Sequence, residues 1–372
     1  MPNMDCCYKY KRAFFSKAFF LAFVFCLPLV SSKRCKQPVI FNFGDSNSDT
    51  GGFAAANGFS FGDPYGRAFF HQPTGRLSDG RLILDFLCES LHTSYLKAYL
   101  NPLEPDISNG VNLAVSGASI LPPNVLFNLG VQINQFSLFH NRSLQLHSKG
   151  RKDVLDKEGF KNALYILDIG QNDLTVALTF NPLPYDQVLE TIPSFISGIK
   201  DAIQAIYKLG GRNFWVHNTG PLGCVPQQLG IRKPNSSEVD EYGCITMLNE
   251  AARAFNSKLN DLCQHLRLQM KDSVIVYVDI YSIKHNLVAN SSSYGLEKPT
   301  MACCGHGGAP YNYDPKIRCL VVAGYNVCEK GDFHISWDGI HYTEAANKIV
   351  ASQILSKKYS TPPLLFNFFC NN

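Results

Sequence analysis

Charged residues are scarce in this sequence. Asp, Glu, Lys and Arg make up 17% of the 372 residues, compared with about a quarter in typical soluble proteins. So low a share is atypical of disordered chains, and it indicates a large buried core. The formal net charge is only +4, which leaves no strongly basic face for nucleic acid or for an anionic membrane surface.

Several recognisable site motifs are absent as well. The chain has no Cys-x-x-Cys pair, no His-Glu-x-x-His and no P-loop, so we expect no metal, no nucleotide and no other cofactor. It also has no internal repeat, no heptad pattern and no Pro/Ser/Gly-rich linker within residues 33–372. We therefore expect residues 33–372 to form a single domain.

One long apolar run is present, and it lies near the N-terminus. Residues 18–30 are almost entirely apolar, Ser31-Ser32 follow them, and basic residues precede them at Lys9, Lys11, Arg12 and Lys17. This order is typical of a secretory signal peptide, and the run is shorter than the ~20 residues that a spanning helix needs. We expect a signal peptide at residues 1–32 and a secreted protein without stable membrane insertion. An uncleaved membrane anchor is the alternative.

Cysteines and glycan-acceptor sequences agree with secretion. Ten of the 13 cysteines follow residue 32, and an even number in an oxidising compartment predicts disulfides. Six of them bound or interrupt two long loops expected at residues 220–243 and 284–331, namely Cys224, Cys244, Cys303, Cys304, Cys319 and Cys328. We expect disulfides to cross-link both loops, with a connectivity that the sequence leaves open. Asn-x-Ser sequences predict glycans at Asn141, Asn235 and Asn290.

Short apolar runs alternate with longer helix-like stretches. We expect strands at residues 39–43, 111–114, 164–169, 213–217 and 274–280. We expect helices at about residues 81–91, 187–209, 238–268 and 343–358. Strands that alternate with helices predict a parallel sheet covered on both faces, and continuously apolar strands fit burial on both sides. The sequence therefore predicts an α/β fold.

The first expected strand stops abruptly at Gly44-Asp45-Ser46. A serine just past a strand lies where an open parallel sheet presents its ligand site, which makes Ser46 a candidate nucleophile. It does not belong to a nucleophile elbow G-x-S-x-G, because Ser48 stands where that pattern has glycine. The alternative is that Ser46 only caps a helix or closes an Asx-type turn.

Three further segments are expected at the same edge of the sheet. Residues 114–118 and 170–173 follow the second and third expected strands, and residues 336–341 open the last expected helix. Because the carboxyl ends of parallel strands meet at one edge, these segments should meet Ser46 there. Taken one at a time, each also has a structural explanation as a turn glycine or a helix cap.

The chemistry of ester cleavage assigns roles to these residues. A serine hydroxyl needs a base to take its proton, and His341 can be that base while Asp338 holds the other ring nitrogen. The tetrahedral intermediate needs donors, which we expect from the backbone N–H of Ser46 and Gly117 and from the side chain of Asn172. Each donor lowers the barrier by on the order of 3 kcal/mol. Glycine at position 117 would also leave room for the acyl group.

Together these blocks resemble the GDSL, or SGNH, hydrolases. The blocks are Gly44-Asp45-Ser46, Asn112-x-Ala114 with Gly117-Ala118, Gly170-x-Asn172-Asp173 and Asp338-x-x-His341. The resemblance covers about residues 37–357 and extends to the plant secreted branch through PTGRLSDGRLILDFL, TGPLGCVP and ACCGHGG. Asn47 stands where the family name has leucine, but it lies after the nucleophile and resembles a variant of the plant branch.

The resemblance implies a fold and a set of roles. The implied fold is a flavodoxin-like three-layer α/β/α sandwich with a central parallel sheet. The implied roles are Ser46 as nucleophile, Asp338 and His341 as its triad partners, and Gly117 and Asn172 as further members of the oxyanion hole.

Two other motifs carry structural predictions only. Residues 73–81 predict a turn followed by a helix cap at Ser78 or Asp79. His306-Gly307-Gly308 lies among cysteines, and we expect it to form a rigid loop.

The predicted function is hydrolysis of a carboxylic ester through an acyl-enzyme. We expect a monomeric, extracellular serine esterase or lipase, of the cell wall or apoplast in a plant, that acts on esters of lipids, glycans or small metabolites. An acyltransferase would use the same residues, so the sequence does not separate the two. A catalytically silent lipid- or glycan-binding wall protein is a further alternative. A glycosidase would need two carboxylates across a sugar, and no such pair stands out.

Overall fold

The computed structural model describes most of the chain that follows the predicted signal peptide. The described residues are 38–101, 107–121, 126–319, 321, 323–329 and 333–371. Residues 1–32, and with them the predicted signal peptide, lie outside the described residues. Of the helices in the described ranges, none is both long and apolar enough to cross a membrane.

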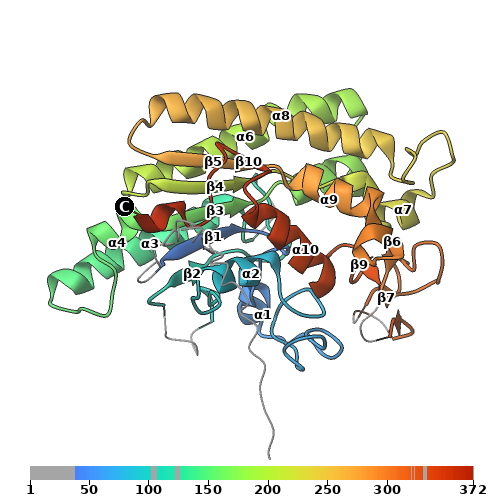
Figure 1. Ribbon diagram of the computed structural model, residues 1–372, viewed down its shortest axis with the longest axis horizontal. Coiled ribbons are helices and arrows are strands. Elements are labelled where there is room, and N and C mark those ends of the chain that lie inside the picture. Colours follow the sequence, from blue (N-terminus) through green and yellow to red (C-terminus); the bar gives the residue numbers. More distant parts are fainter. Residues whose placement is uncertain are drawn as a thin grey trace, which may run out of the picture. The chain divides into compact units, whose positions relative to one another are not determined.

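A six-stranded sheet forms the centre of the described chain (Figure 1). Its strands are β1 (Ile40–Gly44), β2 (Gly110–Asn112), β3 (Leu164–Asp168), β4 (Asn213–His217), β5 (Val274–Val278) and β10 (Ser360–Thr361). Their spatial order is β2-β1-β3-β4-β5-β10, and all neighbours are parallel except β10, which pairs antiparallel with β5. The predicted parallel sheet is therefore confirmed.

Helices cover both faces of this sheet (Figure 1). One core is shared by the strands and by α3 (Leu129–Ser148), α6 (Tyr185–Lys208) and α8 (Thr246–Gln269). The other core is shared by the strands and by α2 (Ile83–Ser90), α9 (Ile280–Ala289) and α10 (Glu344–Leu355). Successive strand side chains point to opposite faces, so Phe41 and Phe43 belong to the first core and Ile40 to the second. This arrangement confirms the three-layer α/β/α sandwich.

The strand order places a switch point beside Ser46. The chain enters the sheet at β1, adds β2 on one side, and then adds β3, β4 and β5 in turn on the other side. This is the flavodoxin-like order, and ligands of such sheets bind outside the carboxyl ends where the winding reverses. β1 and β3 flank that point and pair as far as Gly44 opposite Asp168. Ser46 follows Gly44 after one residue, so it lies at the switch point.

The remaining elements lie in the connections. Short helices are α1 (Gly52–Asn57), α4 (Lys157–Asn162), α5 (Gln171–Thr175) and α7 (Pro226–Arg232), and a π-helical turn at Val176–Phe180 follows α5. Tight 3-10 turns lie at Leu222–Cys224, Ser291–Tyr294 and Phe368–Asn371. Two small sheets join β6 (Lys298–Ala302) to β9 (His334–Ser336) and β7 (Cys304–Gly305) to β8 (Asn326–Val327).

Most predicted element boundaries agree with the structure within a few residues, and three expectations do not. The helix expected from residue 238 begins only at Thr246, because Asp240 accepts hydrogen bonds from the backbone N–H of Tyr242 and Cys244 and folds this stretch into a turn. The loop expected from residue 284 begins later, because α9 continues to Ala289. Helix α3 was not predicted, since Gln, Asn and His interrupt its apolar pattern.

Three disulfides cross-link the two long loops, as predicted. Cys224 is bonded to Cys244 in the first loop, and the second loop contains the pairs Cys303–Cys328 and Cys304–Cys319. Cys370 is also disulfide-bonded. The cysteines Cys88 and Cys263 are buried and free. The chain past residue 32 thus uses most of its described cysteines in disulfides, which agrees with an oxidising compartment.

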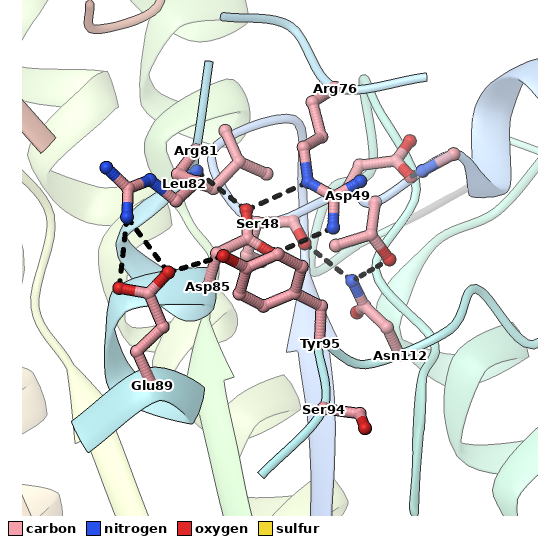
Figure 2. A network of polar contacts seen from close by, with 12 residues as sticks. Ser48, Asp49, Arg76, Arg81, Leu82, Asp85, Glu89, Ser94, Tyr95 and Asn112 are labelled. Atoms are coloured by element: carbon pink, nitrogen blue, oxygen red, sulfur yellow. Dashed lines mark hydrogen bonds and ion pairs between the residues drawn. The ribbon is translucent and has the colours of Figure 1, made fainter. Parts of the chain in front are cut away.

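A buried ion pair joins α2 to the segment that precedes it. Arg76 donates from Nε and Nη2 to the two carboxylate oxygens of Asp85 at 2.8 and 2.7 Å (Figure 2). Asp85 also accepts from the backbone N–H of Leu82 at 2.8 Å, which caps the first turn of α2. The N-cap of α2 is therefore Leu82, whose backbone N–H is bound by Asp85 at the third helical position, and the predicted cap at Ser78 or Asp79 is wrong.

Replacing Asp85 with asparagine should destabilise the protein by roughly 3–5 kcal/mol, because the guanidinium of Arg76 then stays buried without an opposite charge. Denaturant titration measures the free energy of unfolding. The control is Asp272→Asn in the pair with Arg212, where the carboxylate side chain is 59% exposed and the loss should be below about 1 kcal/mol. Equal losses in the two variants would contradict the prediction.

Candidate active site

The loop that carries Ser46 is held from α3. The backbone N–H of Gly44 donates to Gln132 Oε1 at 2.9 Å, and Gln132 Nε2 donates back to the carbonyl of Gly44 at 2.8 Å. Gln132 is fully buried, so this pair of bonds satisfies backbone groups that leave the sheet at the end of β1. The Ser46 side chain itself is nearly buried, with 7% of its surface exposed.

Asn112 at the end of β2 ties the same loop to its neighbouring strand. Its Nδ2 donates to the carbonyl of Ser48 at 2.6 Å and to the hydroxyl of Thr50 at 3.0 Å (Figure 2). Its Oδ1 accepts from Asn42 Nδ2 at 2.8 Å. Asn112 belongs to the second of the blocks identified in the sequence, and the contacts explain why an amide is useful at that position: it donates and accepts at once.

Asp49 joins the Ser46 loop to the loop that contains Gly117. Its Oδ1 accepts from the backbone N–H of Gly51 and Gly52 at 2.8 and 2.5 Å, and its Oδ2 accepts from that of Ser116 at 2.8 Å. Burial raises the pKa of Asp49, and these hydrogen bonds partly offset the rise. Neither Asp49 nor Gln132 was identified from the sequence. The Gly-Gly pair after Asp49 was the available signal, since it marks a turn into a helix.

The residues predicted for the oxyanion hole come from adjacent loops that the structure brings together. Asn172, at the start of α5, donates from Nδ2 to the carbonyl of Ala118 at 2.9 Å. Gly117 precedes Ala118, is exposed, and has a φ of +78°. Apart from Gly117 and its two chain neighbours, no described residue has an atom within 4 Å of a Cβ placed on Gly117. Glycine is thus explained by the left-handed backbone, and its role in admitting an acyl group stays a prediction.

Asp338 and His341 form a close pair. Asp338 Oδ2 lies 2.7 Å from His341 Nδ1, and Oδ1 accepts from the backbone N–H of Ile340 and His341 at 3.0 and 2.9 Å. His341 Nε2 makes no hydrogen bond within the described part of the chain. The pair lies in the loop between β9 and α10, because Thr343 caps α10 and Glu344 begins it. The helix predicted from residue 343 therefore begins within one residue of its expected start, and residues 336–341 lead into it as expected.

The electrostatics of the pair favour an ionised carboxylate. Burial alone would raise the pKa of Asp338, but the facing His341 and the donated hydrogen bonds outweigh burial and bring it below its usual value. A carboxylate that stays ionised accepts from Nδ1–H and leaves Nε2 as the basic nitrogen of the ring.

Residues 73–81 support the segment that follows His341. The hydroxyl of Ser78 donates to the carbonyl of Tyr342 at 3.0 Å, and Asp79 Oδ1 accepts from the backbone N–H of Glu344 at 2.7 Å. Asp79 thus binds a free backbone N–H in the first turn of α10, beside the Thr343 cap, more than 260 residues further along the chain. The structural role predicted for this motif is correct, but it acts on α10 and not on the helix that follows the motif.

The predicted contact between Ser46 and His341 is not among the hydrogen bonds of the structure. In the described ranges the Ser46 hydroxyl has no hydrogen-bond partner, so its bond to His341 stays a prediction; such bonds are often long in a free enzyme. The two segments are close enough to interact electrostatically. Burial and Asp168 raise the pKa of Asp45, the neighbour of Ser46, to about 7, while bonds from Asn47 and the charge of His341 lower it.

Asp45 should make the stability of the protein fall with pH. The pKa of this carboxyl is about 7 in the folded protein and 3.8 in the unfolded chain, so the folded state binds the proton more tightly. The unfolding free energy therefore decreases as the pH rises between these two values. The unfolding free energy of the wild type minus that of Asp45→Asn should fall by up to about 4 kcal/mol from pH 4 to 7. Denaturant titrations of both proteins across this range measure it, and a constant difference would contradict the prediction.

Asn141, Asn235 and Asn290 are all exposed. The group Cys303, Cys328 and His334 is compact enough for a metal ion, but the two cysteines share a disulfide and offer no thiolate. His306 is half-buried and its Nδ1 lies 2.8 Å from the carbonyl of Gly324, which agrees with a structural loop.

Known proteins resemble this chain over most of its length. The sequence model of the GDSL-like Lipase/Acylhydrolase family matches residues 40–354. GDSL esterase/lipase LIP-4 of Arabidopsis thaliana is 52% identical over 338 residues, 90% of each chain. Alpha-L-fucosidase 3 of the same plant is 42% identical over 360 residues, 90% of this chain and 96% of its own. Among solved structures, a catalytic mutant of the acetylxylan esterase Axe2 from Geobacillus stearothermophilus matches 86% of this chain and 92% of its own. The sequence identity is 10% and the TM-score is 0.37, so this likeness is weak.

The family match and the identity with LIP-4 confirm the resemblance that the sequence blocks indicated. Asn47, which replaces the leucine of the family name, does not separate the chain from the family. The chain belongs to the GDSL-like lipase/acylhydrolase family of carboxylic ester hydrolases.

Proposed function

We propose that this protein is a secreted serine esterase in which Ser46, His341 and Asp338 form the catalytic triad. The observation that carries the proposal is the 2.7 Å contact between Asp338 Oδ2 and His341 Nδ1, which leaves Nε2 without a hydrogen bond in the described chain. An imidazole oriented in this way offers Nε2 as a base. Ser46 follows β1 at the switch point of the sheet, where ligands of such folds bind.

The proposed reaction proceeds through an acyl-enzyme. His341 Nε2 takes the proton of Ser46 Oγ as the oxygen attacks the ester carbonyl, and the imidazolium then gives this proton to the leaving alcohol. Water deprotonated by His341 attacks the acyl-enzyme, which releases the acid and restores Ser46. The oxyanion accepts from the backbone N–H of Ser46 and Gly117 and from Asn172, whose amide has a second N–H besides the one bonded to Ala118.

A covalent probe tests this proposal. A fluorophosphonate should label the folded protein once, and peptide mapping should place the label on Ser46, because the probe reacts only with an activated serine. An analogue of the probe that lacks the reactive fluorophosphonate group serves as the control. An intact, folded protein that takes up no label would refute the proposal.

We propose extracellular delivery, in the cell wall or apoplast if the protein is of plant origin, with residues 1–32 removed and residues 33–372 acting as one monomeric domain. Three disulfides and the exposure of Asn141, Asn235 and Asn290 support this. Protein recovered from the medium of an expressing plant cell should begin near residue 33 and should lose mass on treatment with a peptide N-glycosidase. Retention in the cytosol would contradict it.

Glycoside hydrolysis is a second candidate, favoured by the 42% identity with Alpha-L-fucosidase 3. p-Nitrophenyl acetate and p-nitrophenyl α-L-fucoside, given to the same preparation, separate the two activities. We expect cleavage of the acetate alone, because a glycosidase needs two carboxylates on either side of a sugar. Cleavage of the acetate followed by transfer to an added alcohol would identify an acyltransferase that uses the same residues.

A further inference from the structure

Tyr65 reaches the Asp338–His341 pair from a distant part of the chain. Its hydroxyl donates to Asp338 Oδ2 over 3.1 Å, and this is the same oxygen that faces His341 Nδ1 at 2.7 Å. Only 3% of the surface of Tyr65 is exposed, so water does not compete for the bond. The backbone N–H groups of Ile340 and His341 donate to Asp338 Oδ1. Each oxygen of the carboxylate therefore receives two donors.

Packing fixes the position of this hydroxyl. The ring of Tyr65 lies edge-on to Trp337, the neighbour of Asp338, at 5.6 Å between ring centroids, and stacks on Phe61 at 5.3 Å. The next residue, Gly66, donates from its backbone N–H to the carbonyl of Ser78 at 3.0 Å. A side chain held in this way loses little further freedom when it makes its hydrogen bond.

We propose that Tyr65 is a positioning residue for ester hydrolysis: it orients the Asp338 carboxylate toward His341 and draws off part of its negative charge. This inference rests on the proposed function. A hydrogen bond to a carboxylate stabilises its charge, so the hydroxyl weakens the attraction between Asp338 and a protonated His341 while it fixes their geometry.

The other ionisable groups near the pair do not replace Tyr65. Those that interact with Asp338, Tyr65 or His341 through their charge are Tyr313, Arg318 and Asp45. In the described residues none of the three makes a hydrogen bond to the carboxylate, and Tyr313 instead accepts from Gln227. Burial, followed by Asp338, raises the pKa of Tyr65 well above its usual value, so the hydroxyl stays a donor throughout the working pH range.

Tyr65→Phe tests the inference, because it removes the hydroxyl and keeps the ring. We expect kcat to fall about 5- to 50-fold with KM changed less than about twofold. The acid limb of the pH profile of kcat/KM should move to higher pH, since the unshared charge of Asp338 stabilises the imidazolium better. The NMR titration of His341 Cε1, which needs no turnover, should show its midpoint displaced in the same direction by about 0.5 pH unit.

Two further proteins make the result decisive. Tyr165→Phe is the matched control, because that hydroxyl is equally buried and donates to the carbonyl of Phe160 at 2.7 Å, so its loss should lower stability and move neither pH readout. A site-specifically incorporated fluorotyrosine in place of Tyr65, a stronger donor of almost the same shape, should displace both readouts to lower pH.

If Tyr65→Phe matches the Tyr165→Phe control in kcat, in the acid limb and in the NMR midpoint, the inference is overturned and Tyr65 is only structural. If the fluorotyrosine protein moves neither readout, the inference is likewise overturned, even where Tyr65→Phe does not fold. A wild-type protein that hydrolyses no ester would instead refute the proposed function, and the NMR midpoint would still decide whether Tyr65 acts on the pair.

Discussion

Replacing Ser46 with alanine should reduce ester hydrolysis by roughly 10⁴- to 10⁶-fold, the largest effect we expect from a single substitution in this chain. Without Oγ no acyl-enzyme forms, and only the oxyanion donors and substrate binding still lower the barrier. The stability should change little, because the Ser46 hydroxyl makes no hydrogen bond to any described residue. Initial rates on p-nitrophenyl acetate, together with thermal unfolding, measure both.

The control for this prediction is Ser60→Ala, which removes an exposed hydroxyl whose bond goes to the neighbouring carbonyl of Phe61. Its rate should equal that of the wild type, and its labelling by the fluorophosphonate should be unchanged. A variant Ser46→Ala that keeps more than about one tenth of the wild-type rate would show that the nucleophile lies elsewhere, because residual catalysis without a nucleophile is far smaller.

Replacing Asp338 with asparagine should lower kcat by about 10⁴-fold while the loop keeps its shape. An amide can still accept the backbone bonds from Ile340 and His341, but its N–H₂ can now face Nδ1. The imidazole then carries its proton on Nε2, where it can no longer accept the proton of Ser46. The same esterase assay measures the loss, and a crystal structure or NMR spectrum checks that the fold is unchanged.

Asp272→Asn is the matched control for the asparagine substitution. It makes the same chemical change just before the first residue of β5, at the opposite end of the strand from the carboxyl edge of the sheet, on a side chain that is 59% exposed. Its activity should equal that of the wild type. If Asp338→Asn retained comparable activity, the pair with His341 would be a structural contact and the proposed mechanism would fail.

Short-range patterns were sufficient to predict much of the candidate site. Asp338 and His341 are three residues apart, so their contact depends on local geometry that a motif can specify. Ser46 could be placed because the end of an apolar strand is visible in the sequence, and parallel strands present their carboxyl ends at one edge. The same reasoning placed Asn172 beside the loop of Gly117, which the bond to Ala118 confirms.

Side chains that support these residues could not be found in this way. Gln132 holds Gly44 from a helix whose apolar pattern is too weak to predict. Asp79 lies in a motif that predicts a local cap, yet it accepts from Glu344. Both bonds join residues far apart in sequence, and no local propensity distinguishes a polar side chain that caps its own helix from one that caps another.

The sequence by itself determined the alternation of strands and helices, the membership of a family and the identity of the candidate reactive residues, because all three depend on periodicity and on short spacings. Only the tertiary structure decided that Tyr65 shares one oxygen of Asp338 with His341 and that Asp79 accepts from the first backbone N–H of α10. These contacts span more than 260 positions, and they form because the packed layers bring buried polar groups together, where each must find a partner.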